Sequence, residues 1–275
     1  MFALFGFNPY NDRIEKQARE QSPAFCYVRK RGCRIIEYSL MHGDCLELMK
    51  GIPDGSVDMI LCDLPYGTTR NKWDTVIPFD ALWAEYDRVC KDTAAIVLFS
   101  QMPFTASLVN SRLDLFRYEW IWEKAQGSGH LNARKMPMKI HENICVFYRS
   151  LPVYNPQWGE GKPYSVTRGS DSSNYGKQKA NITTVSDGRR YPVDVIRIPK
   201  SANDRRLHPT QKPVALCEYL IKTYTNPGEV ILDNCMGSGS TGVACMNAGR
   251  RFIGMELDEK YFEIAKQRIE SAVNI

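Results

Sequence analysis

Short apolar runs alternate with helix-like stretches in two separate parts of the chain. In the first part, residues 34–123, the apolar runs at 57–62 and 94–99 have the length and composition of buried strands. Residues 79–90, which lie between them, have a helical pattern. Strands that alternate with helices predict a mostly parallel sheet with both faces covered.

The same alternation returns near the C-terminal end of the chain. The pattern predicts, in order, a helix at 213–224, a strand at 230–233, a helix at 241–247, a strand at 251–256 and a helix at 259–272. We therefore expect an α/β fold built on a doubly wound, mostly parallel sheet.

Residues 150–207 have a different texture from the two α/β parts. They are rich in Gly, Ser, Pro, Asn and basic residues, with aromatic residues interspersed and only weak periodicity. A disordered linker would contain fewer aromatics, so we expect an irregular insert that docks onto another surface. The expected division is residues 1–149, the insert 150–207, and residues 208–275.

Composition excludes several classes of protein. No run of 18 apolar residues occurs, so no transmembrane helix is expected. The nine cysteines form no C-x-x-C pair, and several lie inside apolar runs. This usage predicts buried thiols in a reducing cytoplasm, without a disulfide framework or a zinc site. With only four histidines, a His-rich metal centre is not expected either.

Positive charge is concentrated in the middle of the chain. Residues 124–212 hold 16 Lys and Arg against 6 Asp and Glu, a net charge of +10. The remainder holds 20 Lys and Arg against 25 Asp and Glu, a net charge of −5. A local basic block suits a polyanion such as the DNA backbone, although a solvated basic face would give the same count.

A glycine-rich loop follows the predicted strand at 230–233. It reads Gly237-Ser-Gly239-Ser-Thr-Gly242, and Glu256 closes the next strand 17 residues after Gly239. This acid is placed to accept hydrogen bonds from ribose hydroxyls, as in dinucleotide-binding folds. Asp233 directly before the loop would repel a pyrophosphate but would hold an ammonium group. The two acids favour S-adenosylmethionine, which has no phosphate, over NAD.

A second motif, Asp63-Leu64-Pro65-Tyr66-Gly67, follows the predicted strand at 57–62. It therefore lies where open α/β sheets bind their ligands. An exocyclic amine on an aromatic ring is a poor nucleophile, because its lone pair is delocalised. Asp63 can accept one N–H of such an amine, the Leu64 carbonyl can accept the other, and Tyr66 can stack on the ring. Pro65 holds the chain extended at this point. Taken alone, the motif would also fit a strand-ending turn.

Together these motifs resemble the β-class DNA amino-methyltransferases, which are circularly permuted so that the catalytic half precedes the cofactor half. The resemblance covers residues 35–270. It rests on the motif at Asp63, the glycine loop, and three further segments: His42-Gly-Asp44-Cys, His208-Pro-Thr-Gln-Lys212-Pro213 and Gly254-Met-Glu256-Leu-Asp258. In the family the catalytic tetrad reads D-P-P-Y in most adenine enzymes and S-P-P-Y in cytosine-N4 enzymes. Leu64 departs from this pattern at a position that contributes its carbonyl.

The resemblance implies a role for each candidate site residue. The catalytic residues would be Asp63, Leu64, Pro65 and Tyr66. The cofactor would be bound by Asp233, Gly237, Gly239 and Glu256, with Asp44 at its adenine and Lys212 and Thr210 at its methionine end. The insert would recognise DNA, with Arg168, Arg189, Arg190, Arg205 and Arg206 as candidate contacts to phosphates or guanine edges. His141 is a further candidate DNA contact, whereas Trp120 and Trp122 are expected in the core.

The resemblance therefore predicts a cytoplasmic, site-specific methyltransferase that acts on N6 of adenine in double-stranded DNA after flipping the base. Cytosine-N4 methylation, RNA or protein-amide methylation, a non-catalytic DNA-binding module and an NAD-dependent oxidoreductase remain as alternatives. Intact Asp63, Tyr66, Gly237 and Gly239 argue against the non-catalytic module. The recognition sequence, a homodimer, a restriction endonuclease partner and the role of residues 1–33 are left open.

Overall fold

A nine-stranded sheet forms the centre of the computed structural model, which describes residues 26–30, 34–68, 74–168, 182–199 and 211–273. In their spatial order the strands are β1 (Cys26–Lys30), β2 (Arg34–His42), β13 (Arg251–Glu256), β12 (Val230–Asp233), β3 (Val57–Asp63), β4 (Cys90–Ser100), β6 (Lys139–Phe147), β5 (Phe116–Ser128) and β11 (Val195–Ile196). The strands from β2 to β4 are mutually parallel, β5 and β11 are parallel to each other, and β1 and β6 are antiparallel to their neighbours. The predicted α/β fold with a mostly parallel sheet is confirmed.

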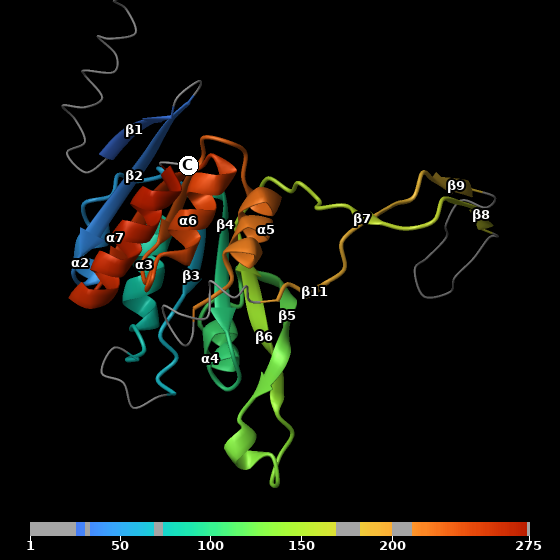
Figure 1. Ribbon diagram of the computed structural model, residues 1–275, viewed down its shortest axis with the longest axis horizontal. Coiled ribbons are helices and arrows are strands. Elements are labelled where there is room, and N and C mark those ends of the chain that lie inside the picture. Colours follow the sequence, from blue (N-terminus) through green and yellow to red (C-terminus); the bar gives the residue numbers. More distant parts are fainter. Residues whose placement is uncertain (1–25, 31–33, 69–73, 169–181, 200–210, 274–275) are drawn as a thin grey trace, which may run out of the picture.

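Helices cover both faces of this sheet (Figure 1). They are α2 (Cys45–Met49), α3 (Phe79–Val89), α4 (Phe104–Ser111), α5 (Val214–Tyr224), α6 (Ser240–Ala248) and α7 (Glu259–Val273). One core cluster joins the sheet to α5, α6 and α7, and the other joins it to α2, α3 and α4. Successive residues of β3 and β4 alternate between these clusters, which is why both strands are apolar runs rather than alternating patterns.

The direction in which the chain winds reverses between β12 and β3. From β3 the chain crosses through α3 to β4, whereas from β12 it crosses through α6 to β13, on the other side. The two strands are direct neighbours, with Ile231 opposite Met59. Ligands of open α/β sheets bind outside the carboxyl ends of the strands at such a switch point. The motifs after β3 and β12 therefore meet at one place.

The core elements agree with those predicted from the sequence to within a few residues at their ends. The central tryptophans Trp120 and Trp122 are 4% and 1% exposed, which confirms that they belong to the core. The predicted irregular insert contains short strands: β7 (Gly159–Glu160) with β10 (Arg189–Arg190), and β8 (Tyr164–Arg168) with β9 (Ile182–Ser186). It also provides β11, which joins the main sheet beside β5. None of the helices in the described ranges is long and apolar enough to cross a membrane.

Candidate active site

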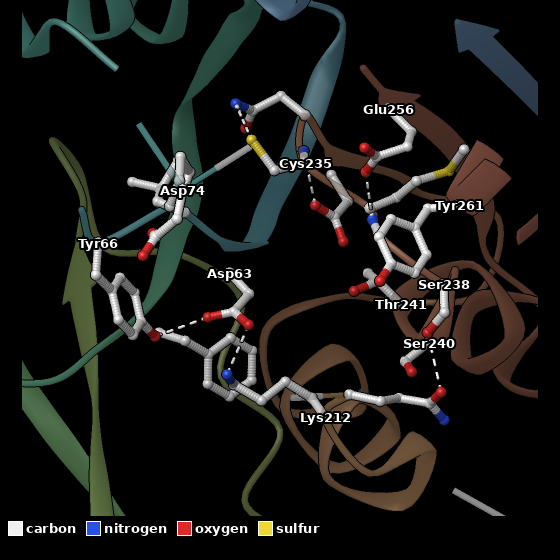
Figure 2. Close-up of a pocket in the computed structure, with 18 of the residues that line it drawn as sticks. Asp63, Tyr66, Asp74, Lys212, Cys235, Ser238, Ser240, Thr241, Glu256 and Tyr261 are labelled. Atoms are coloured by element: carbon white, nitrogen blue, oxygen red, sulfur yellow. Dashed lines mark hydrogen bonds and ion pairs between the residues drawn. The ribbon is translucent and has the colours of Figure 1, made fainter. Parts of the chain in front are cut away.

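A cavity of about 890 Å³ lies at the carboxyl ends of β12 and β3. Its walls come from the loop after β3, the end of β5, the loop between β12 and α6, and the end of β13. It contains two clusters of polar side chains, one around Asp63 and the other around Glu256 (Figure 2). A cavity of this volume is near the upper end of the usual range for ligand sites.

The turn after β3 holds Asp63 and Tyr66 against each other. The Tyr66 hydroxyl donates to Oδ1 of Asp63 at 2.7 Å. The ring of Tyr66 stacks on Phe104, with a centroid separation of 4.9 Å and an interplanar angle of 28°. Burial and the charge of Asp63 raise the pKa of Tyr66 well above its ordinary value, so the hydroxyl remains a donor. Leu64 and Pro65 also line the cavity.

Asp74 closes this turn, a role that the sequence did not suggest. Its carboxylate is buried and accepts the backbone N–H groups of Gly67 and Thr68 at 2.8 and 2.9 Å. Gly67 has φ +67°, and a Cβ there would lie 2.9 Å from a methyl of Val76. A glycine is therefore required for the turn that presents Asp63 and Tyr66.

Lys212 lies beside Asp63 although 149 residues separate them in the sequence. Its Nζ is 2.6 Å from Oδ2 of Asp63 and 3.2 Å from Oε2 of Glu142. It is also 5.1 Å from the centre of the Phe99 ring. Figure 2 shows Asp63 between this ammonium group and the hydroxyl of Tyr66. Lys212 was expected to line the methionine end of a cofactor site, and it lines the cavity while paired with the candidate catalytic acid.

Glu142 continues this network into the wall of the cavity. Its Oε1 lies 3.1 Å from Nζ of Lys124, and both side chains are about 15% exposed. Burial disfavours the charge of Glu142, but Lys212 and Lys124 outweigh this and lower its pKa. Burial likewise disfavours the charge of Lys212, but Asp63 and Glu142 outweigh it and raise the pKa of Lys212. Two acids and two lysines therefore form a continuous chain of ion pairs with no net formal charge.

The glycine loop between β12 and α6 forms the opposite wall. Oε2 of Glu256 accepts the backbone N–H of Gly237 at 2.8 Å, and its Oε1 accepts that of Asp258 at 2.9 Å. Each carboxylate oxygen keeps a second lone pair for a ligand hydroxyl. Gly237 has φ +53°, and a Cβ there would meet nothing within 4 Å, so the backbone of this residue faces open space in the cavity.

Gly239 was expected to be one of the cofactor-binding residues, but the structure shows that packing requires a glycine here. It does not line the cavity. It has φ +79° as the residue before α6, and a Cβ there would lie 2.9 and 3.0 Å from Cβ and Cα of Ala265 in α7. The third glycine, Gly242, packs in the same way against Ile269 and Phe252. These two glycines permit close packing of α6.

Asp233 ends β12 and faces the cavity while only 3% exposed. Its Oδ1 accepts the backbone N–H of Cys235 at 3.2 Å. Burial raises its pKa to about 7, although hydrogen bonds from Thr241 and from the backbone of Cys235 partly oppose this. A carboxyl with this pKa would be ionised fully by a cationic ligand group placed against it.

Ser240 supplies a buried polar atom to the wall of the cavity. Its buried Oγ lines the cavity and makes no hydrogen bond within the described part of the chain. It stands at the first residue of α6, where backbone N–H groups and the helix dipole favour an anion. A ligand carboxylate could accept from the Ser240 hydroxyl and from the backbone N–H groups at the start of α6. It would lie in the same cavity as the carboxyl of Asp233.

Asp44 also lines the cavity, and it has a structural role as well. Its Oδ1 caps helix α2 by accepting the backbone N–H groups of Leu46 and Glu47 at 2.9 and 3.3 Å. Thr210, the other expected cofactor residue, lies outside the described residues.

The candidate DNA contacts that the structure describes do not line the cavity. Arg189 is exposed, pairs with Asp187 at 2.9 Å and lies 5.2 Å from the ring centre of Trp158. Arg190 is half-buried, donates to Ser186 Oγ and to the Lys162 carbonyl, and therefore holds the insert together. His141 is exposed on β6 opposite Glu123. The side chain of Arg168 and the whole of Arg205 and Arg206 lie outside the described residues.

The sequence of the chain is similar to those of known DNA methyltransferases. The sequence profile of a family described as DNA methylase matches residues 57–267. The DNA adenine methyltransferase YhdJ of Escherichia coli strain K12 is 28% identical over 263 residues, covering 88% of each chain. The type II methyltransferase M.HpaI of Haemophilus parainfluenzae is 25% identical over 252 residues, covering 87% of this chain and 76% of that protein.

Solved structures share the fold. The M1.HpyAVI–SAM complex superposes with a TM-score of 0.57 at 24% identity, covering 84% of this chain and 98% of that one. The cytosine-N4-specific PvuII DNA methyltransferase gives a TM-score of 0.62 at 17% identity, covering 84% and 86% of the two chains. At these identities the structures establish the architecture alone.

Proposed function

The chain belongs to the DNA methylase family, and on this premise we propose that it transfers a methyl group from S-adenosylmethionine to N6 of adenine in double-stranded DNA. The observation that carries the proposal is the position of Asp63. Its carboxylate is held by Tyr66 and Lys212 in the same cavity as the glycine loop.

The polar groups of the glycine-loop wall fit S-adenosylmethionine. The ammonium of its methionine part would be held by Asp233, and the carboxylate by the buried Ser240 hydroxyl at the start of α6. The ribose hydroxyls would be accepted by Glu256, and Gly237 leaves room for the ligand beside the backbone. When bound, the cofactor supplies an electrophilic methyl group on a sulfonium.

Asp63 would receive the target amine. One of its oxygens accepts an N–H of the exocyclic amine, while the Leu64 carbonyl accepts the other, so that the nitrogen lone pair turns toward the methyl group. Positive charge would then develop on this nitrogen, the carboxylate of Asp63 would stabilise it, and one amine proton would leave to that carboxylate or to solvent, which gives the neutral methylamino group. The ammonium of Lys212 pairs with the Asp63 carboxylate, and the Tyr66 hydroxyl fixes the orientation of that carboxylate.

The target base must leave the duplex to reach this position. The face of the Tyr66 ring opposite Phe104 would stack on a flipped base. Adenine is favoured over cytosine by an aspartate at position 63, in line with the D-P-P-Y pattern of adenine enzymes. The 28% identical relative is likewise named an adenine methyltransferase.

A transfer assay with labelled cofactor tests this function. The purified chain is incubated with S-adenosylmethionine carrying a tritiated methyl group and with unmethylated plasmid DNA, an RNA transcript of the same plasmid, or a protein mixture. Label is expected in DNA only. Asp63→Ala should abolish the transfer, whereas the control Asp92→Ala, at an 82% exposed position near the start of β4, should not. Label in RNA or protein but not in DNA would overturn the substrate class.

A further inference from the structure

Strands β5 and β6 continue past the edge of the sheet as a two-stranded ribbon, residues 123–141. Pairing between β4 and β6 ends at Ser100 and Asn143, and pairing between β5 and β11 ends at Trp122. Beyond this point, the pairing of β5 with β6 continues through Glu123 and His141 to Ser128 and Lys139. Figure 1 shows the ribbon projecting from the body of the molecule below α4.

The ribbon starts at the wall of the active-site cavity. β5 runs parallel to β4 and β3, so its carboxyl end lies at the same edge as Asp63. Residues 124–128 line the cavity, and Lys124 pairs with Glu142 on the facing strand. The ribbon therefore extends outward from the place where a target base would enter.

Contacts near its base fix the direction of the ribbon. Nζ of Lys139 donates to the carbonyl of Met102 at 3.2 Å, which ties β6 to the segment before α4. The two strands approach closely at Gly127, where a Cβ would lie 3.1 Å from Cβ of Met138. The end of the ribbon is a short 3₁₀ helix, His130–Asn132. The base of the ribbon is thus held to the body of the molecule, and the ribbon ends in this short helical turn.

The surface of the tip combines apolar and cationic side chains. Leu131 is 88% exposed and Met136 is 56% exposed. Arg134 and Lys135 are exposed beside them, and no acidic residue occurs between Ser128 and His141. An exposed leucine at the end of a basic ribbon suits a partner that offers both phosphates and the apolar faces of stacked bases.

We propose that this ribbon enters duplex DNA beside the target base and that Leu131 packs into the gap that the flipped base leaves. Arg134 and Lys135 would contact the phosphates on either side. A two-stranded ribbon fits a groove of B-DNA, and apolar side chains inserted between bases offset the cost of unstacking. The inference rests on the proposed DNA methyltransferase function and adds a surface outside the residue 150–207 insert.

Leu131→Ala tests the role in base flipping. The methylated site is first located by sequencing plasmid DNA after treatment with the wild-type protein, and a short duplex carrying that site is synthesised. A second duplex carries an abasic position opposite the target base, so that the base is already unpaired. On the paired duplex, Leu131→Ala should methylate about tenfold more slowly than the wild type. On the unpaired duplex the variant should recover most of the wild-type rate, because an unpaired base costs less to flip. Leu113→Ala, which removes a 63% exposed leucine before β5, is the control and should match the wild type on both.

Equal reductions in rate for Leu131→Ala on both duplexes, or no reduction on either, would overturn the inference. Arg134→Ala/Lys135→Ala should independently reduce the slope of log affinity for DNA against log salt by roughly 1.8, whereas Lys266→Ala on α7 should leave it unchanged. An unchanged slope for the double variant would show that Arg134 and Lys135 do not contact phosphates. Wild-type protein that methylates DNA while these variants behave normally refutes the inference alone, and wild-type protein that methylates no DNA refutes the proposed function itself.

Discussion

Lys212 and Asp63 form an ion pair at 2.6 Å, with the lysine 9% and the aspartate 32% exposed. Asp63 ends β3, whereas Lys212 lies just before α5, so the pair joins the two parts of the chain across the cavity. A nearly buried ammonium group therefore lies in direct contact with the candidate catalytic carboxylate. Glu142, on the other side of Lys212, balances the charge of the lysine.

Glu142→Gln should reduce catalysis through Lys212 without altering cofactor binding. The substitution preserves the shape of the side chain but removes one of the two carboxylates that stabilise the Lys212 ammonium. We expect the rate of a single turnover to fall at least about tenfold, the factor that corresponds to about 1.4 kcal/mol of transition-state stabilisation. The pH profile of the rate should shift with it. Glu123→Gln, at the exposed pair with Arg197, is the matched control. Equal reductions in cofactor affinity and rate would indicate a purely structural role.

Cofactor affinity should depend on pH through Asp233. Burial raises its pKa to about 7, so the carboxyl is mostly neutral at pH 6 and mostly ionised at pH 8. A cofactor ammonium binds the ionised form, so affinity should rise with pH across this window by up to about tenfold per pH unit below the pKa. Calorimetric titration at several pH values measures this. Asp233→Asn should bind more weakly and without this dependence, and a wild-type affinity that is flat from pH 6 to 8 would contradict the assignment.

The glycines of the loop should separate into binding and packing positions. Gly237→Ala places a methyl group in the open cavity, so cofactor affinity should fall while the strained φ costs about 1–2 kcal/mol of stability. Gly242→Ala places a Cβ 2.8 Å from both Ile269 Cγ1 and Phe252 Cε1, so it should destabilise the fold by about 1–3 kcal/mol. Urea unfolding and cofactor titration of both variants test this. The opposite pattern would show that Gly242 is the residue nearest to the ligand.

DNA affinity should also depend on the basic residues of the insert. Neutralising Arg189, Arg190, Arg205 and Arg206 together should reduce the log–log slope of DNA affinity against salt by roughly 0.9 for each phosphate that these side chains neutralise in the wild type. Arg190→Ala alone should additionally loosen the insert, because its guanidinium bridges Ser186 and Lys162. Fluorescence anisotropy over a series of salt concentrations measures the slope. If the quadruple variant keeps the wild-type slope, the insert does not bind the DNA backbone.

The sequence was most informative where a functional motif directly follows a strand. Asp63 and Asp233 both end apolar runs, so their place at the carboxyl edge of a parallel sheet followed from the pattern alone. Glu142 was not predicted, because its position depends on the antiparallel register that sets it opposite Trp122 and near Lys124. No local pattern determines such a register. The local sequence shows only that Lys124 and Glu142 are charged residues adjoining apolar strand segments, although both lie in segments that resemble those of the family.

The reason for glycine at position 239 was also beyond local pattern. A glycine-rich loop predicts a close approach to the backbone, but not whether a ligand or a helix makes that approach. The neighbour of Gly239 is Ala265 of α7, which lies 26 residues later in the chain. The predicted irregular insert likewise includes β11, whose two residues are too few to give a periodic signal.

The central claim is that the Asp63 site methylates N6 of adenine in DNA. Unmethylated DNA is treated with the wild-type protein and S-adenosylmethionine, digested to nucleosides and separated by mass spectrometry, with Asp63→Ala treated in parallel. We expect N6-methyldeoxyadenosine from the wild type and none from Asp63→Ala, while calorimetry shows that the variant still binds the cofactor. N4-methyldeoxycytidine in its place would contradict the choice of base, and N6-methyldeoxyadenosine formed equally by both proteins would contradict the catalytic role of Asp63.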